Sequence, residues 1–206
     1  MFFEYAPADG LPVCLLEVAN LLTKFINFNV FTMRGLNGKK LEKEFLDAYD
    51  RYAEAILRHA YLRVDSRAIA QDLTSETFTK TWQFLANGGK VKNFKSFLYR
   101  VCNNLIIDYY RSKAKTNVSL EDVTEQSEPA EELPYENIDM GVAFEMVKKH
   151  LDSLPADYKQ ILIHRYIDEL DVLEIKEITG KSVTNIYTII HRGLKILRKK
   201  IHGKEN

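Results

Sequence analysis

The chain has 206 residues, of which 46% are hydrophobic and 28% are charged, and its formal net charge is zero. This composition excludes a disordered chain and is sufficient to bury the core of one domain or of two small ones. A neutral total does not exclude nucleic acid as a partner, because the charge is segregated: residues 119–139 contain eight acids and no base, whereas residues 181–206 contain seven Lys or Arg and one Glu.

The first 40 residues are an N-terminal extension whose role the sequence leaves open. Residues 11–31 are apolar, but Glu17 and Lys24 interrupt them, so they are a poor transmembrane segment. The acids Glu4 and Asp9 do not fit the positively charged start of a signal peptide. Two interpretations of this extension stay open. It forms a helix that packs in the core or binds a partner, or translation starts at Met33 and the first 32 residues are not made.

The cysteines and histidines do not indicate a metal site. Cys14 and Cys102 lie far apart among apolar neighbours, and the five histidines are scattered. Because no ligand spacing such as Cys-x-x-Cys occurs, we expect neither a metal nor another cofactor. Unpaired cysteines are typical of a reducing compartment, so we expect a cytoplasmic protein.

Helical spacing of apolar residues dominates the chain from residue 41 onwards, and no strand-like alternation persists, so the sequence predicts an all-α fold. A first domain, residues 41–114, is expected to contain three helices. The first covers 41–63, the second follows a break at 64–66 and runs to about 86, and the third covers 94–112 after a break at 87–89. The acidic, Pro-containing segment 115–139 is typical of a flexible linker. The prediction is therefore two small helical domains joined by a flexible acidic linker.

The second predicted domain, residues 140–206, has the layout of a helix-turn-helix. Its helices are expected at 142–151, 155–167, 172–179 and 183–201. Asp171 followed by Glu174 is the pattern of a capping box, and Ser182 occupies the N-cap position of the last helix. The short Gly-containing turn at 179–182 joins a short helix to a longer one, as in a helix-turn-helix.

The last predicted helix combines an apolar stripe with a polar, increasingly basic face. The stripe contains Val183, Ile186, Ile190, Leu194, Leu197 and Ile201, and the opposite face carries Thr184, Asn185, Thr188, His191, Arg192, Lys195 and Lys199. A small polar start followed by bases suits a recognition helix, which reads base edges near its N-terminus and binds phosphates further along. The alternative is a solvated surface whose late cations complement the helix dipole.

The second predicted helix has a polar, acidic stripe that consists of Asp72, Ser75, Glu76, Thr79 and Gln83. We expect Ile69, Leu73, Thr77 and Phe84 to face the core and Phe78 to be exposed beside the acids. Such a surface can dock a basic partner helix. A solvated helix face is the alternative.

The third predicted helix mixes aromatic, amide and basic side chains. Its expected buried stripe is Phe94, Phe97, Leu98, Val101, Cys102, Leu105 and Tyr109, and its other face presents Tyr99, Asn103, Ile107 and Tyr110, flanked by Arg100, Asn104 and Arg111 and preceded by Lys90, Lys92 and Lys95. Rings that stack on bases, amides that bond to base edges and cations that follow phosphates suit single-stranded nucleic acid. A Tyr-rich helix packed on a neighbour is the alternative.

Three ordered blocks together resemble a bacterial RNA polymerase sigma factor of the extracytoplasmic-function (ECF) type. The blocks are DLTSETFTKTW, FKSFLYRVCNNLIIDYYR, and LDSLPADYKQILIHRYIDELDVLEIKEITG followed by HRGLKILRK. The resemblance covers residues 41–201 apart from the linker. It implies sigma domains two and four, no enzymatic activity, and a function in promoter recognition, DNA melting and transcription initiation.

The resemblance also implies a role for each block. The first block would dock on the clamp helices of the polymerase β′ subunit, through Asp72, Leu73, Ser75, Glu76 and Phe78. The second would melt the promoter and hold the non-template strand of the minus-ten element, and loop 87–93 would help to pocket a flipped base. The residues implied for this role are Lys92, Lys95, Tyr99, Arg100, Asn103, Asn104 and Arg111. The last helix would read the minus-thirty-five element, through Lys181, Ser182, Thr184, Asn185, Tyr187, Thr188, His191, Arg192 and Lys195. The implied partners are core polymerase (also through its β flap), promoter DNA and an anti-sigma factor, but no membrane.

The chain departs from the family's usual pattern at several positions. Ser75 stands where a Gln is usual, and Phe97 where a Trp is usual. In the recognition helix, Tyr187 and Ile189 replace frequent basic residues, which alters the expected base specificity. Packing at the edge of the core is an alternative role for Tyr187.

Two other functions stay open from the sequence. A helix-turn-helix regulator could bind duplex DNA without polymerase, although that leaves the acidic stripe and the Tyr/Asn helix without a role. A DNA enzyme with a tyrosine nucleophile would use Tyr109, Tyr110 and Arg111 with His191 and Arg192, but these lie in two modules separated by the linker.

Overall fold

A computed structural model describes residues 36–64, 66–119 and 138–202. Within these ranges every regular element is an α-helix, and the chain divides into two compact units, residues 1–119 and 120–206. This confirms the prediction of an all-α chain with two helical domains. The N-terminal residues 1–35 and most of the predicted linker, 120–137, lie outside the described residues. Among the described helices, none combines the length and the apolarity needed to cross a bilayer.

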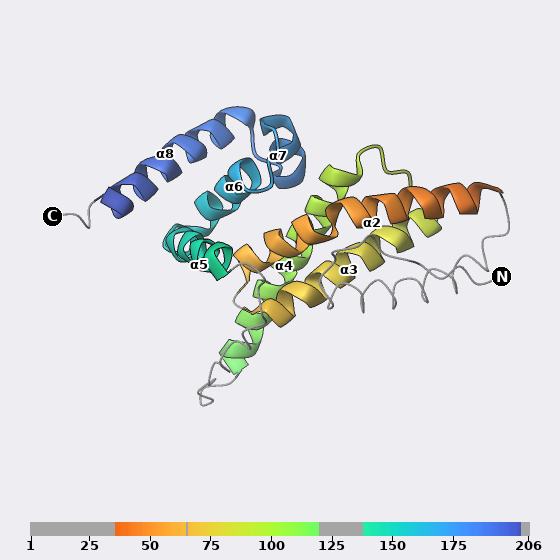
Figure 1. Cartoon of the computed structure of the whole chain (residues 1–206), viewed down its shortest axis with the longest axis horizontal. Helices are drawn as coiled ribbons and strands as arrows, with labels where there is room; N and C mark the ends of the chain where they lie inside the picture. Colours follow the sequence, from red (N-terminus) through yellow and green to blue (C-terminus); the bar gives the residue numbers. More distant parts are fainter. Residues whose placement is uncertain (1–35, 65, 120–137, 203–206) are drawn as a thin grey trace. The chain divides into compact units, whose positions relative to one another are not determined.

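The first unit contains three described helices that lie against one another (Figure 1). They are α2 (Leu36–Arg63), α3 (Arg67–Ala86) and α4 (Phe94–Ser119). The core between α2 and α3 is aromatic: the ring of Phe78 lies 4.8 Å from that of Tyr49, and the ring of Phe45 lies 5.2 Å from that of Trp82. Because α4 contacts both α2 and α3, each helix buries a broad arc rather than one narrow stripe.

Threonines in the middle of α3 are buried without leaving their hydroxyls unbonded. Thr74, Thr77 and Thr81 are each at most 1% exposed. Their hydroxyls donate to the backbone oxygens of Ala70, Leu73 and Thr77, respectively, at 2.7 to 2.8 Å. This bond to the preceding turn satisfies the polar atom, so the methyl side of each threonine can pack in the core. The buried arc of α3 is therefore wider than its aliphatic residues indicate.

Two predicted helix ends in the first unit were wrong. Helix α2 begins at Leu36 rather than at residue 41, and α4 continues to Ser119 rather than ending at 112. The predicted start of the linker at 115 therefore falls inside α4. No Gly or Pro interrupts the sequence between 112 and 119, and helix ends without such a signal are poorly marked in sequence.

The second unit has the predicted helix-turn-helix. It contains α5 (Ile138–Asp152), α6 (Ala156–Tyr166), α7 (Val172–Thr179) and α8 (Val183–His202) (Figure 1). Asp171 and Glu174 form the predicted capping box at the start of α7, and Gly180 ends α7 in the left-handed conformation with a φ of 70°. The backbone N–H of Asn185 donates to Ser182 Oγ at 3.3 Å, which confirms Ser182 as the cap of α8.

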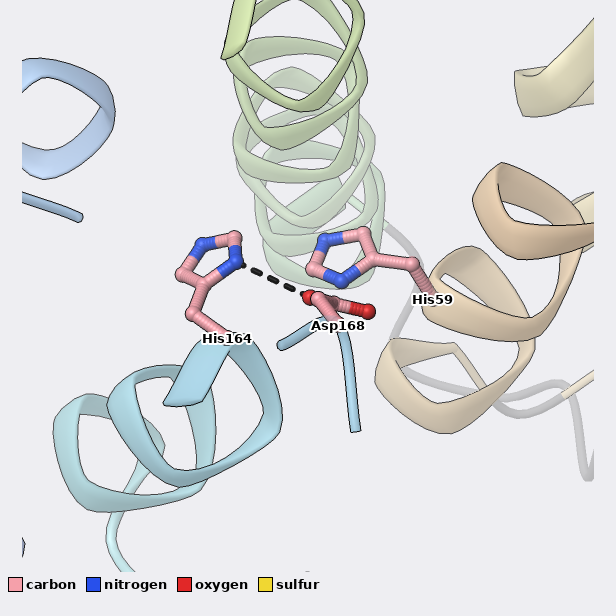
Figure 2. A group of neighbouring side chains, drawn as sticks. All are labelled: His59, His164 and Asp168. Atoms are coloured by element: carbon pink, nitrogen blue, oxygen red, sulfur yellow. Dashed lines mark hydrogen bonds and ion pairs between the residues drawn. The ribbon is translucent and has the colours of Figure 1, made fainter. Parts of the chain in front are cut away.

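A buried polar pair holds the turn between α6 and α7. The imidazole Nδ1 of His164 lies 3.0 Å from Oδ2 of Asp168, as Figure 2 shows, and both side chains are fully buried. The backbone N–H of Leu170 donates to the backbone oxygen of His164 at 2.9 Å, and Nη1 of Arg165 donates to the backbone oxygen of Leu170 at 2.9 Å. These bonds set where α7 begins, and so where α7 and α8 lie relative to α6.

Candidate functional site

The polar stripe of α3 faces solvent, as the sequence predicts. Asp72 and Glu76 are exposed, and Ser75 is half-buried with its hydroxyl bonded to the backbone oxygen of Gln71 at 2.9 Å. Glu76 pairs with Lys80 at 3.0 Å, and both side chains are about half exposed, so the pair is open to competition by another charged partner. This face offers carboxylates to a basic surface.

The prediction that Phe78 is exposed beside these acids was wrong. Phe78 is fully buried, with its ring 6.2 Å from that of Phe45, and Leu73 is only 7% exposed. Phe84, predicted to face the core, is instead 42% exposed. Because α3 packs against both α2 and α4, its buried arc is wide enough to include Phe78. Phe84 lies in the last turn of α3, where its ring meets Phe97 of α4. Phe78 and Leu73 therefore support the acidic face from beneath.

The structure also corrects the predicted exposed face of α4. Tyr99 is 1% exposed, with its ring edge-on to His59 at a centroid distance of 5.3 Å. Asn103 is 3% exposed, and its Oδ1 accepts from Nη1 of Arg63 at 3.3 Å. The hydroxyl of Tyr110 donates to the backbone oxygen of Arg63 at 2.6 Å. These three side chains tie α4 to α2. Tyr99 and Asn103 are buried because α4 has two neighbours and buries more than the single stripe that the spacing predicts, whereas Tyr110 and Ile107 are exposed as predicted, at 39% and 42%.

The accessible polar groups of α4 are consequently fewer than the sequence predicts. Arg100, Asn104 and Arg111 are exposed, and Lys92 in the preceding loop is exposed as well, whereas Lys95 is half-buried. Nη1 of Arg111 lies 3.1 Å from Oδ1 of Asp108. Amide and guanidinium groups thus remain available on this surface for bases and phosphates.

The loop between α3 and α4 is held at both ends. The backbone N–H of Gly89 donates to the backbone oxygen of Phe84 at 2.9 Å, and Asn93 Oδ1 accepts from the backbone N–H of Ser96 at 3.2 Å, which caps α4. The Phe84 and Phe97 rings lie 5.0 Å apart at 33°, and Cζ of Arg100 lies 5.4 Å from the Phe97 centroid. Sequence reasoning missed this aromatic pair; two phenylalanines flanking Gly88-Gly89 and the loop were the available signal.

The polar face of α8 is exposed apart from Thr188, which is half-buried. The exposed side chains include Thr184, Asn185, Tyr187, His191, Arg192, Lys195 and Lys199. Tyr187 is 59% exposed, so it does not seal the edge of the core. Ile189, by contrast, is 7% exposed and belongs to the core, so it is not placed to replace a base-contacting cation. Lys181, in the turn, pairs with Asp157 at 3.2 Å.

Comparisons with known proteins match the two units separately. The model of sigma-70 region 2 matches residues 48–116, and that of sigma-70 region 4 matches residues 144–197. The chain is similar to the ECF RNA polymerase sigma factor SigW of Bacillus subtilis strain 168, with 28% identity over 165 residues, which cover 76% of this chain and 88% of SigW. It is also similar to the RNA polymerase sigma factor SigV of the same organism, with 29% identity over 141 residues, 68% of this chain and 81% of SigV.

Solved structures share the fold. The sigma factor RpoE from Bartonella quintana, determined with the anti-sigma factor NepR, has a TM-score of 0.64 and 20% identity, covering 80% of this chain and 98% of RpoE. CnrH, determined with the cytosolic domain of CnrY, has a TM-score of 0.60 and 17% identity, covering 79% of this chain and 90% of CnrH. At these identities the likeness concerns the fold.

Proposed function

The chain belongs to the ECF type of RNA polymerase sigma factors, which direct the polymerase to promoters, and we propose that its two units make two separate promoter contacts. The observation that carries this proposal is the order of the matches, with region 2 on the first helical unit and region 4 on the helix-turn-helix unit. The residue-level assignments below follow from which side chains are accessible.

The first unit binds core polymerase through the acidic face of α3. Asp72 and Glu76 supply exposed carboxylates for the basic clamp helices of the β′ subunit, and half-buried Ser75 lies between them. Leu73 and Phe78 contribute by holding the backbone of this face against α2, because they are themselves buried. The proposed contact therefore has a charged surface and an apolar support.

The same unit melts the minus-ten element and binds its non-template strand. Asn104 offers an amide to an unstacked base, and Arg100, Arg111 and Lys92 offer cations to phosphates. Half-buried Lys95 lies in the first turn of α4. Tyr99 and Asn103 act from within the unit by fixing α4 on α2.

The second unit binds the minus-thirty-five element with α8. Exposed Thr184, Asn185 and Tyr187 lie in the first two turns, where a recognition helix contacts base edges. Arg192 and Lys195 lie further along, where phosphates are bound. Thr188, Ser182 and Lys181 contribute mainly to the geometry, since each already forms a bond within the unit.

We further propose that the factor acts without catalysis of its own, in the cytoplasm with the polymerase, and that an anti-sigma factor restrains it, as NepR binds RpoE. The tyrosine-nucleophile alternative is disfavoured because its candidate residues belong to two separate units, and the hydroxyl of Tyr110 donates to the backbone oxygen of Arg63. The second unit also contacts the β flap in this proposal.

Run-off transcription tests the proposed function. Purified chain and core polymerase are incubated with a library of genomic fragments, and core polymerase alone is the control. We expect discrete start sites that appear only when the chain is present. If the chain binds duplex DNA sequence-specifically without polymerase and produces no start site with it, the helix-turn-helix regulator is the better explanation.

A further inference from the structure

The turn that precedes α8 carries one cation, and an acid of α6 holds it. Nζ of Lys181 lies 3.2 Å from Oδ2 of Asp157, which belongs to the first turn of α6. The side chain of Lys181 is 23% exposed, whereas that of Asp157 is 65% exposed. The pair joins two segments that are 24 residues apart in the sequence. It therefore connects α6 to the start of the helix that we propose to bind DNA.

The backbone around Lys181 is fixed independently of this ion pair. Gly180 is left-handed, with a φ of 70°, and the backbone N–H of Lys181 donates to Oγ1 of Thr179 at 3.4 Å. One residue later, Ser182 Oγ caps α8 by accepting from the backbone N–H of Asn185. Because these local bonds hold the turn, loss of the ion pair should release the ammonium group of Lys181 without moving the N-terminus of α8.

The ion pair bears on DNA binding because of where the turn lies. In a helix-turn-helix the N-terminal residues of the second helix contact base edges in the major groove, so the turn just before it lies close to the edge of that groove. A lysine at the edge of the groove binds phosphate by its charge, and such a contact adds affinity for every sequence alike. A carboxylate beside the lysine offsets this charge.

From this geometry, and resting on the proposed role of α8, we propose that Asp157 limits the affinity of the second unit for DNA by holding Lys181 away from the phosphates. Asp157 is a positioning residue, because it acts through Lys181 and its own carboxylate is not attracted to DNA. Arg192 and Lys195 lie further along α8 and are exposed, so the restraint concerns the phosphate nearest the turn.

Asp157→Asn tests the proposal, because it removes the charge and keeps the shape of the side chain. Holoenzyme made from core polymerase and this variant should bind promoters about two- to fivefold more tightly, the equivalent of one exposed ion pair. The factor should be the same for every upstream sequence. The slope of the logarithm of affinity against the logarithm of salt concentration should become steeper by about one unit, because one more phosphate is neutralised.

Two results would overturn the proposal while leaving the proposed function intact. They are an affinity and a slope equal to those of the unchanged protein, and weaker binding, which would make Asp157 a support for the DNA contact. Failure of the unchanged holoenzyme to bind any promoter would instead count against the proposed function. Asp157→Asn should also lower stability slightly, since an acid in the first turn complements the dipole of α6, but lower stability alone does not steepen the salt dependence.

A double-variant cycle shows whether Lys181 carries the effect. In a Lys181→Ala background, Asp157→Asn should change neither the affinity nor the slope. An equal gain with and without Lys181 would mean that the carboxylate acts on DNA directly, which contradicts the proposal. Asp152→Asn is the matched control, because Asp152 pairs with Lys159 in the same unit and neither residue is proposed to contact DNA. Its slope should equal that of the unchanged protein, and a steeper slope would show that removing any acid of this unit is sufficient.

Discussion

The ring of Phe84 occupies the space that a side chain at Gly89 would need. A β-carbon at Gly89 would lie 2.4 Å from Cε1 of Phe84, closer than atoms can approach without movement. The same ring stacks on Phe97 at 5.0 Å. The backbone of loop 87–93, which the family resemblance implies helps to pocket a base, is therefore packed against an aromatic pair that joins α3 to α4.

Gly89→Ala should consequently lower the free energy of unfolding by about 1 kcal/mol, because the half-exposed Phe84 ring must turn away. In a Phe84→Ala background the same substitution should lower the free energy of unfolding by less. Chemical unfolding of the unchanged protein, the two single variants and the double variant measures this difference. Gly88→Ala is the matched control: nothing lies near its β-carbon, but its φ of 84° disfavours a side chain. Its cost should not depend on Phe84. Equal costs of Gly89→Ala in both backgrounds would refute the packing relationship.

Charge reversal on α3 should weaken polymerase binding. Glu76→Lys places a cation toward the basic clamp helices while removing only a half-exposed pair with Lys80, so the fold should persist. Co-purification with core polymerase measures the effect. Glu54→Lys reverses another exposed acid, on α2, and should bind normally. Equal retention of core enzyme by both variants would show that the α3 face is not the contact.

Phe78→Ala should reduce stability rather than remove a surface contact. Truncating this fully buried ring leaves a cavity and should cost about 3–5 kcal/mol. Phe84→Ala, at a side chain that is 42% exposed, should cost clearly less. Thermal and chemical unfolding compare the two. A Phe78→Ala protein of unchanged stability that fails to bind polymerase would instead restore Phe78 as a direct contact.

The adjacent residues Asn103 and Asn104 should behave differently. Asn104 is exposed, so Asn104→Ala should reduce open-complex formation on duplex promoters more than on pre-melted templates, with stability unchanged. Asn103 is buried and bonded to Arg63, so Asn103→Ala should lower the free energy of unfolding by about 1–3 kcal/mol. Equal losses for Asn104→Ala on duplex and pre-melted DNA would argue against its role in strand capture.

Arg192→Ala should weaken promoter binding about equally for all upstream sequences. If its guanidinium binds a phosphate, the slope of the logarithm of affinity against the logarithm of salt concentration should fall by about one unit. Arg165→Ala removes a cation of the same unit whose Nη1 bonds to the backbone of Leu170, so it should change stability but not this slope. A slope for Arg192→Ala equal to that of the unchanged protein would exclude the phosphate contact.

Local sequence signals were sufficient to predict the helix-turn-helix. The capping box of Asp171 and Glu174, the cap at Ser182 and the left-handed Gly180 each depend on atoms within a few positions along the chain. Their pattern therefore specifies where α7 ends and α8 begins without knowledge of the rest of the fold. The order of the three sequence blocks likewise identified the family from the residues alone.

Which side chains are accessible on α3 and α4 was decided only by the tertiary structure. Apolar spacing indicates a helical period, but a helix with two neighbours buries a wide arc whose centre depends on where both neighbours lie. Phe78, Tyr99 and Asn103 therefore lie in the core, and Phe84 lies at the surface. In α8, which packs one face on its unit, the sequence placed the polar face correctly, yet burial of Ile189 and exposure of Tyr187 required the packing of α6 and α7 against it.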